Sequence, residues 1–172
     1  MKYALERVQV RIAEDPDVKN RKKYEGFCRV NDHITMNTKT PTFMLAPCGI
    51  NCAVCYAHLR KKKTCPGCRG QAESQPTYCR RCQIRDCVIS LGIDFCSECA
   101  SFPCTRIKQI DKRYRLRYHV NLIENAVRIK NVGAEQFLRE DKQNWTCPGC
   151  EGVVCMHSRI CSCCGKEMEE PV

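Results

Sequence analysis

The stretch CPGCEGVVCMHSRICSCC, residues 147–164, decides the fold, because it holds two cysteine pairs with the spacing of a tetrahedral metal site. Within each pair two residues separate the cysteines, so one tight turn can direct both sulfurs at a single ion. Ten residues separate the two pairs, as in zinc ribbons. We therefore predict a zinc ribbon over residues 145–168, with the ion bound by Cys147, Cys150, Cys161 and Cys164.

Three further potential ligands lie inside this stretch, namely Cys155, His157 and Cys163. Four thiolates already complete a structural zinc site. We therefore expect His157 to lie beside the site or at the surface rather than to bind the ion.

The composition favours metal ions over disulfides as the cross-links of the fold. The chain has 172 residues and 18 cysteines but only five phenylalanines and one tryptophan, so an aromatic core is thin. Residues 1–7 run directly into charged side chains without the apolar segment of a signal peptide, and no stretch is long enough to cross a membrane. We expect a cytoplasmic protein, and cysteines in the reducing cytosol are more often ligands than disulfides.

Residues 44–104 form a second cysteine-rich region. Its Cys-x-x-Cys pairs include a Cys-Pro-Gly-Cys-x-Gly knuckle at residues 65–70 that repeats the form of residues 147–152, and the cysteine spacing of residues 79–87 recurs in residues 96–104. Glycine in such a knuckle lets backbone N–H groups point at sulfur. The predicted metal ligands of this region are Cys48, Cys52, Cys55, Cys65, Cys68, Cys79, Cys82, Cys87, Cys96, Cys99 and Cys104.

These 11 thiols are one short of three four-ligand sites, and the spacing does not determine which of them share an ion. His58 could supply a twelfth ligand, although a lone histidine beside a basic run is more often solvated. We predict zinc, because Cys-x-x-Cys knuckles favour tetrahedral coordination. The alternative is a 4Fe-4S cluster, which tolerates the odd count and the Cys48-x3-Cys52-x2-Cys55 trio. The same trio occurs in enzymes that bind S-adenosylmethionine, but this region is too short for their barrel.

Four segments of this region together resemble a cysteine-rich prokaryotic family, common in anaerobes, that is known only as a domain of unknown function. They are APCGINCAVC (46–55), CPGC (65–68), CQIRDC (82–87) and CSECASFPC (96–104). The resemblance covers about residues 44–104, and residues 118–165 resemble the helical linker and zinc ribbon that end the longer members. It implies metal binding and assigns no reaction.

The remaining residues predict a helical linker and a peripheral extension. Residues 105–144 contain no cysteine, and their apolar residues indicate three helices: one marked by Ile107 and Ile110, one over 122–129 that ends at a left-handed Gly133, and one over 134–141 that buries Phe137 and Leu138. Residues 1–43 show no clear period, so we expect a weakly ordered extension that the metal core does not need.

The expected fold is a small, metal-stapled, α-rich (α+β) protein. Short helices and knuckles surround the metal sites of residues 44–104, helices over 105–144 form a linker, and residues 145–168 form the ribbon.

The formal net charge of +10 suggests an acidic partner, but metal-bound thiolates offset it. Three four-thiolate zinc sites of about −2 each would lower it to about +4. The best nucleic-acid candidate is residues 108–119, where Lys112, Arg113, Arg115 and Arg117 alternate with Tyr114 and Tyr118; residues 60–63 are a second basic run. A solvated helix face whose tyrosines pack on the core explains the same pattern, and we favour it.

The sequence contains no phosphate-binding loop, nucleophile elbow or His-Glu-x-x-His helix. We therefore predict a zinc-binding interaction or regulatory module with an unknown protein partner, rather than an enzyme. An iron–sulfur redox protein and a nucleic-acid-binding zinc protein are the alternatives.

Overall fold

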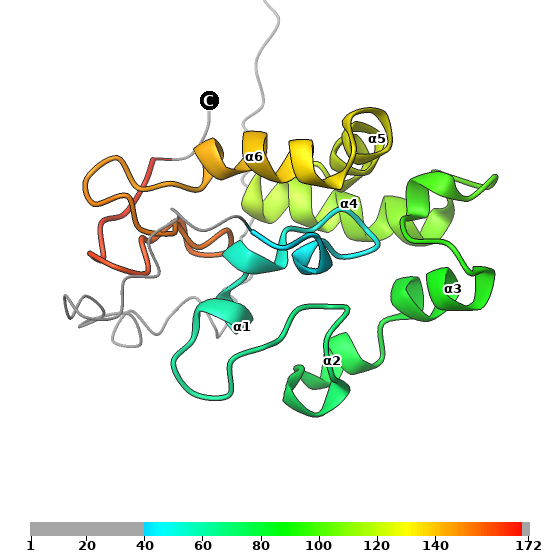
Figure 1. Cartoon of the computed structure of the whole chain (residues 1–172), viewed down its shortest axis with the longest axis horizontal. Helices are drawn as coiled ribbons and strands as arrows, with labels where there is room; N and C mark the ends of the chain where they lie inside the picture. Colours follow the sequence, from blue (N-terminus) through cyan, green and yellow to red (C-terminus); the bar gives the residue numbers. More distant parts are fainter. Residues whose placement is uncertain (1–39, 170–172) are drawn as a thin grey trace, which may run out of the picture.

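The computed structural model describes residues 40–169 and is rich in helices (Figure 1). Three longer helices lie together on one side of the molecule: α4 (Thr105–Tyr118), α5 (Leu122–Val132) and α6 (Ala134–Asn144). Three shorter ones lie on the other side: α1 (Tyr56–Leu59), α2 (Thr77–Arg80) and α3 (Gln83–Leu91). Short 3-10 helices occur at η2 (Thr42–Met44), η3 (Cys52–Val54), η4 (Ala72–Ser74) and η5 (Cys96–Glu98).

The three helices predicted for residues 105–144 are confirmed. Ile107 is fully buried on α4, and Phe137 and Leu138 are buried on α6, as their spacing predicts. α6 continues beyond the predicted end, to Asn144. Gly133 does end α5, but its φ of 81° and ψ of 157° differ from the left-handed cap that we expected.

A buried carboxylate joins α4 to α5. Asp111 Oδ1 accepts hydrogen bonds from the N–H groups of Leu122 (2.8 Å) and Ile123 (3.2 Å), the first two residues of α5. Asp111 Oδ2 accepts a hydrogen bond of 2.7 Å from Arg115 Nε. A negative charge at this position satisfies N–H groups that have no partner within the helix and interacts favourably with the helix dipole.

The main hydrophobic core includes residues from both cysteine-rich regions. Met44 and Val54 from the first region share this core with Trp145 and Met156 from the second. The backbone N–H of Met156 also donates a hydrogen bond of 2.8 Å to the carbonyl oxygen of Val54. The two regions that the sequence analysis treats as separate units therefore pack directly on each other.

The β structure of the described residues consists of isolated antiparallel bridges. Leu45 bridges to Asn51, and three more bridges fold the C-terminal segment back on itself: Thr146–Val153, Val154–Cys161 and Ile160–Glu167. The bridges place the loop of residues 147–152 against the loop of residues 161–166.

Most of the predicted extension of residues 1–43 lies outside the described residues. Its last part is described: Pro41 and Thr42 accept backbone hydrogen bonds from Met44 and Leu45. None of the helices within residues 40–169 has the length and apolar character needed to cross a lipid bilayer.

Candidate metal centre

Four cysteine sulfurs of the C-terminal segment converge. Cys147 Sγ lies 3.7 Å from Cys164 Sγ, and Cys150 Sγ lies 3.6 Å from Cys161 Sγ. All four sulfur atoms lie within 4.8 Å of one another, and two of these residues are buried while two are exposed. The structure thus brings together the four residues predicted as ligands of the ribbon, in a group that could hold a metal ion.

Backbone N–H groups point at the sulfur of the first cysteine in each pair. The donors come from the residues two and three positions later: Gly149 and Cys150 for Cys147, and Cys163 and Cys164 for Cys161. The distance from Cys163 N to Cys161 Sγ is 3.4 Å. N–H groups in this position stabilise a thiolate and orient it toward a cation.

Two thiols of the quartet, Cys147 and Cys161, differ in how readily they ionise. Burial raises the pKa of Cys147, but hydrogen bonds from the N–H groups of Gly149 and Cys150 and from the Cys164 thiol outweigh it and bring the pKa to about 7. Burial raises the pKa of Cys161 to about 12, despite its own two N–H bonds. Cys147 therefore forms a thiolate near neutral pH, and a bound cation would displace the proton of Cys161.

Gly152 packs against this quartet and leaves no room for a side chain. A Cβ atom there would lie 2.5 Å from Cys163 Cβ, 3.1 Å from Cys161 Sγ and 3.2 Å from Cys150 Sγ. A Cβ atom at Gly149 would lie 3.8 Å from Cys147 Sγ, which is an ordinary contact. The second glycine of this knuckle is thus required by close packing, whereas the first is not.

The cysteines of the central region lie near one another but are less tightly gathered. Within residues 40–169, the C-terminal quartet is the only group of three or more His, Cys, Asp or Glu ligand atoms that lie within 4.8 Å of one another. The prediction that the eleven central cysteines bind metal in four-ligand sites therefore stays a prediction.

Electrostatic interactions show which central thiols are neighbours. Burial raises the pKa of Cys48, and the charges of Cys68, Cys82 and Cys96 raise it further. Burial also raises the pKa of Cys96 to about 12, together with charges that include those of Cys104, Cys87 and Cys99. Cys48 and Cys96 thus each lie near several other thiols, and Cys82 influences the pKa of both.

The two Cys-Pro-Gly-Cys knuckles, which we expected to share one form, have different backbones. The positive φ falls at Gly67 (91°) in the central knuckle but at Glu151 (58°), after the second cysteine, in the C-terminal one. The N–H of Cys68 donates to Cys52 Sγ at 3.4 Å, which lies outside its own pair. The central knuckle therefore connects two cysteine pairs, while the C-terminal knuckle turns around one sulfur.

Cys155 is a buried thiol beside the central cysteines that the spacing did not identify as a ligand. It directly precedes Met156, whose N–H donates to the carbonyl oxygen of Val54, so Cys155 lies next to Cys55. After burial and a backbone hydrogen bond from Ala57, the charge of Cys155 is the next largest influence on the pKa of Cys55, which is raised to about 12. No sequence signal marks Cys155, because it belongs to no cysteine pair.

His58 is the other candidate for a twelfth ligand. Its Nδ1 lies 2.8 Å from the carbonyl oxygen of Cys65. A carbonyl oxygen only accepts, so Nδ1 carries the hydrogen, and Nε2 of the neutral ring keeps the lone pair that binds metals.

The basic segment of residues 108–119 forms most of α4. Tyr114 and Tyr118 are partly buried and pack against the main core. Arg115 pairs with Asp111, while Arg113 and Arg117 are exposed.

Residues 44–109 match the model of a family described as "Protein of unknown function (DUF3795)". No curated protein and no solved structure matches the chain. The matched segment contains the eleven central cysteines and the start of α4, and the C-terminal quartet lies outside it. The central region of this chain is thus similar to a family without an assigned function, as the order of its cysteines indicates.

Proposed function

We propose that this chain is a zinc-binding protein in which Cys147, Cys150, Cys161 and Cys164 hold one structural zinc ion in a zinc ribbon. The convergence of the four sulfurs carries the proposal, with S···S distances of 3.6 and 3.7 Å. Tetrahedral zinc with bonds of about 2.3 Å separates its sulfur ligands by about 3.8 Å. The N–H groups directed at Cys147 and Cys161 also suit a cation bound by thiolates.

The number of ligands supports a structural role for this ion. Catalytic zinc keeps a position open for water or substrate, whereas four protein thiolates close the coordination sphere. The ion then holds the C-terminal loops against the main core and fixes the surface around them. We infer that the protein acts as an interaction or regulatory module.

The zinc content of the full chain tests this proposal. Cys150→Ser should remove about one zinc ion per chain. Lys166→Gln, a change at an exposed residue near the same loop, is the control and should keep the full content. X-ray absorption of the wild-type protein should show four sulfur ligands at about 2.3 Å. An unchanged zinc content in Cys150→Ser would refute the site.

We propose a second metal-binding region in the central thiols, and a specific observation favours iron–sulfur chemistry there. The thiols around Cys48 and Cys96 influence one another's pKa, yet no three of the described central sulfurs lie within 4.8 Å. In a 4Fe-4S cluster each cysteine binds a different iron, so its sulfurs lie further apart than around one zinc ion. With Cys155 or His58 as the twelfth ligand, the region has enough donors for three four-ligand sites.

Anaerobic purification distinguishes the two metals. An iron–sulfur protein should be brown and contain iron and acid-labile sulfide, and Cys48→Ser should lower both while leaving the C-terminal zinc in place. A colourless protein with more than one zinc per chain would instead support zinc, the metal that the knuckles predict.

A further inference from the structure

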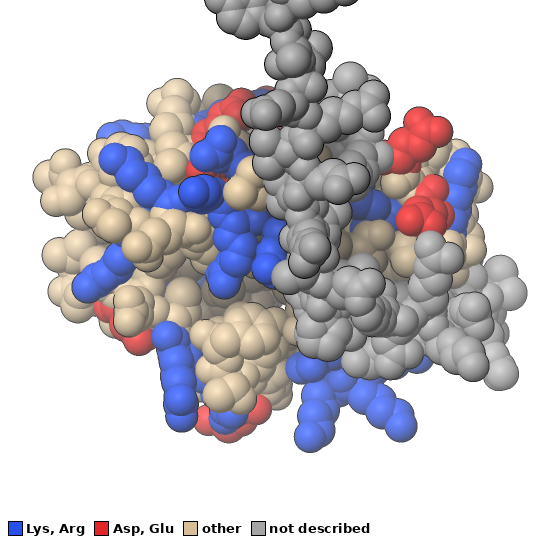
Figure 2. All heavy atoms as spheres, turned by 180° about the vertical axis from the view of Figure 1, so that it is seen from behind, with Lys and Arg blue, Asp and Glu red and all other residues tan. Residues whose placement is uncertain are grey.

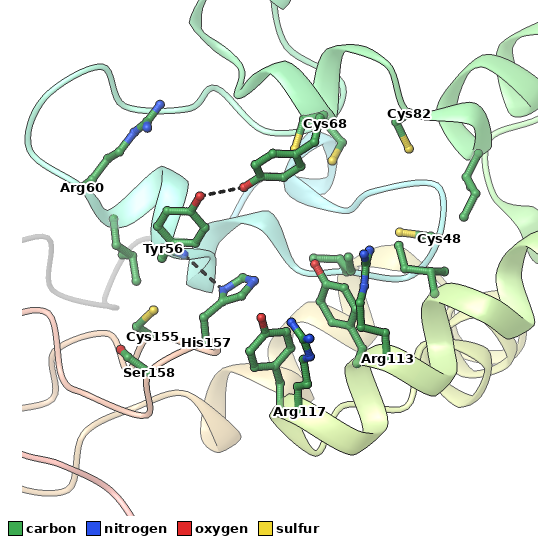
Figure 3. A pocket seen from close by; sticks show the side chains of 18 of the residues that line it. Cys48, Tyr56, Arg60, Cys68, Cys82, Arg113, Arg117, Cys155, His157 and Ser158 are labelled. Atoms are coloured by element: carbon green, nitrogen blue, oxygen red, sulfur yellow. Dashed lines mark hydrogen bonds between the residues drawn. The ribbon is translucent and has the colours of Figure 1, made fainter. Parts of the chain in front are cut away.

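A cavity of about 1010 Å³ lies between α4, the end of α1 with the loop that follows it, α2 and the C-terminal residues 155–162 (Figure 3). Clefts that bind small molecules and cofactors commonly have volumes up to about 1,000 Å³. None of the C-terminal cysteine quartet lines this cavity. Five thiols of the central metal-binding region proposed above do line it, so the cavity adjoins that region: Cys48, Cys68, Cys79, Cys82 and Cys155.

The lining of the cavity is strongly basic. Its cations come from two distant parts of the chain, and Figure 3 shows Arg60 on one side with Arg113 and Arg117 across from it. The only acidic residue among the lining residues is Glu167. The cations are Arg60, Lys61, Lys62, Arg106, Arg113 and Arg117. Such a concentration of one charge in a concave site attracts anions.

The fold thereby brings together the two basic runs that the sequence showed separately. On α4 the lining cations recur at Arg106, Arg113 and Arg117, which is the spacing of one helix face. Lys108 and Lys112 lie on the same helix, are exposed, and do not line the cavity. Lys and Arg side chains are spread over the face of the molecule drawn in Figure 2, so it is the position on one helix face, rather than the overall charge, that distinguishes the α4 cations of the cavity.

Some of the polar groups at the cavity lack an ion-pair or hydrogen-bond partner among the described residues, although the Arg113 guanidinium lies over the ring of Tyr114, 6.0 Å from its centroid. Arg106 and Arg113 form no ion pair within residues 40–169. Ser158 Oγ is buried without a hydrogen-bond partner in that part of the chain, and Ser158 lines the cavity. Guanidinium groups and a hydroxyl are the side chains that commonly bind phosphate oxygens.

Aromatic rings form another part of the lining. Tyr56 Oη and Tyr78 Oη are 2.8 Å apart, so a hydrogen bond joins the two hydroxyl groups at the tips of the rings. The ring of His157 contacts Tyr56 and Tyr118, with centroids 5.2 and 4.7 Å apart. Tyr78 is 61% exposed, so its ring is available to a planar ligand. Aromatic rings next to cations are the usual arrangement for stacking nucleobases while binding their phosphates.

From this combination we propose that the cavity binds a nucleotide, either free or as part of a single-stranded nucleic acid. The cations of α4 and of residues 60–62 contact the phosphate, and the tyrosines stack on the base. The cavity would thus give this metal-binding protein a ligand or nucleic-acid partner.

The first experiment identifies the ligand class. The metal-loaded full chain is titrated with inorganic phosphate, AMP and a single-stranded oligonucleotide of about 12 nucleotides. We expect AMP, the oligonucleotide or both to bind more tightly than phosphate. Equal affinity for AMP and the oligonucleotide indicates a free nucleotide, whereas binding of the oligonucleotide alone indicates a nucleic acid. No binding of either, or no preference over phosphate, would overturn the proposal.

The second experiment locates the site with variants of equal charge. Arg113→Gln with Arg117→Gln should weaken binding by about tenfold or more and reduce its salt dependence, because both side chains line the cavity. Lys108→Gln with Lys112→Gln removes the same charge from the same helix outside the cavity and should change the affinity less than about twofold. Equal effects of the two pairs would show non-specific attraction and overturn the proposal.

Two further measurements separate ligand binding from other roles of these residues. The metal content of Arg113→Gln with Arg117→Gln should equal that of the wild type; a loss would show that the cations serve the nearby thiolates instead. Tyr78→Phe keeps the ring and should bind normally, whereas Tyr78→Leu should bind more weakly. Equal affinity of the two Tyr78 variants would contradict stacking on this ring.

Discussion

Among single residues, Gly152 should control the C-terminal metal centre as strongly as the cysteines themselves. We predict that Gly152→Ala reduces the zinc content by up to one ion per chain and destabilises the fold by about 1–3 kcal/mol, the usual range for overpacking. The added methyl group would lie 2.5 Å from Cys163 Cβ and close to two of the ligand sulfurs. Zinc analysis and thermal unfolding measure both effects.

Gly149→Ala is the matched control for this prediction. It adds the same methyl group to the same loop, but its nearest neighbours would be 3.8 Å away, so the zinc content and the unfolding temperature should stay close to those of the wild type. If the two variants had the same zinc content and unfolding temperature, the loop around Cys163 would have moved to accommodate the methyl group at position 152, and the prediction would be wrong.

The individual cysteines show what spacing can and cannot predict. The convergence of Cys147, Cys150, Cys161 and Cys164 could be predicted from sequence, because two short pairs at ribbon spacing meet through local turns and bridges. The position of Cys155 could not be predicted, because its neighbour Cys55 lies far away in sequence and only the tertiary fold brings them together. The shared Cys-Pro-Gly-Cys motif was misleading, since Gly67 adopts a positive φ and Gly149 does not.

Between elements, the junction of α4 and α5 depends on Asp111. We predict that Asp111→Asn lowers the free energy of unfolding by about 1–3 kcal/mol at neutral pH. The amide keeps one acceptor oxygen, but it loses the charge that binds Arg115 and that favours the N-terminus of α5. Chemical denaturation of the metal-loaded protein measures the change.

Glu124→Gln is a suitable control for Asp111→Asn. Glu124 is an exposed carboxylate in the first turn of α5, so its replacement should cost well under 1 kcal/mol. Similar losses in the two variants would contradict a special role for the buried carboxylate.

The helices also differ in how well the sequence predicts them. The apolar residues of α4, α5 and α6 recur at helical spacing, and the cores they form follow from that spacing. By contrast, α1, α2 and the 3-10 helices contain only three or four residues each, which is too short for any period to appear. Their positions are set by turns around cysteines and by tertiary contacts, so the sequence predicts short helices there but not their bounds.

At the level of the whole molecule, the main finding is that the two cysteine-rich regions share a core. Asp141 on α6 reinforces this, because its carboxylate accepts hydrogen bonds from Asn51 Nδ2 (2.8 Å) and Trp145 Nε1 (3.0 Å). Asn51 belongs to the central region, and Trp145 lies two residues before Cys147, the first residue of the C-terminal quartet. The sequence analysis divided the chain by the frequency of cysteines along it. That frequency does not indicate which segments pack together, so the shared core could not be predicted.

Because the two regions share a core, we predict that loss of the C-terminal zinc also destabilises part of the central region. In Cys150→Ser, hydrogen exchange should accelerate not only in residues 145–168 but also in residues 44–56. Val54 and Met44 pack in the same core as Trp145 and Met156, and the N–H of Met156 bonds to Val54. Elements that lose packing partners open more often, and their backbone amides exchange faster.

Trp145 provides an independent readout of the same coupling. It is the single tryptophan of the chain and is 6% exposed, so opening of the core should shift its emission to longer wavelengths. In Lys166→Gln, which keeps all four thiols, both the emission and the exchange of residues 44–56 should match the wild type. If zinc loss accelerated exchange only within residues 145–168, the C-terminal segment would be an independent unit, and the contacts between Met156 and Val54 would not couple it to the central region.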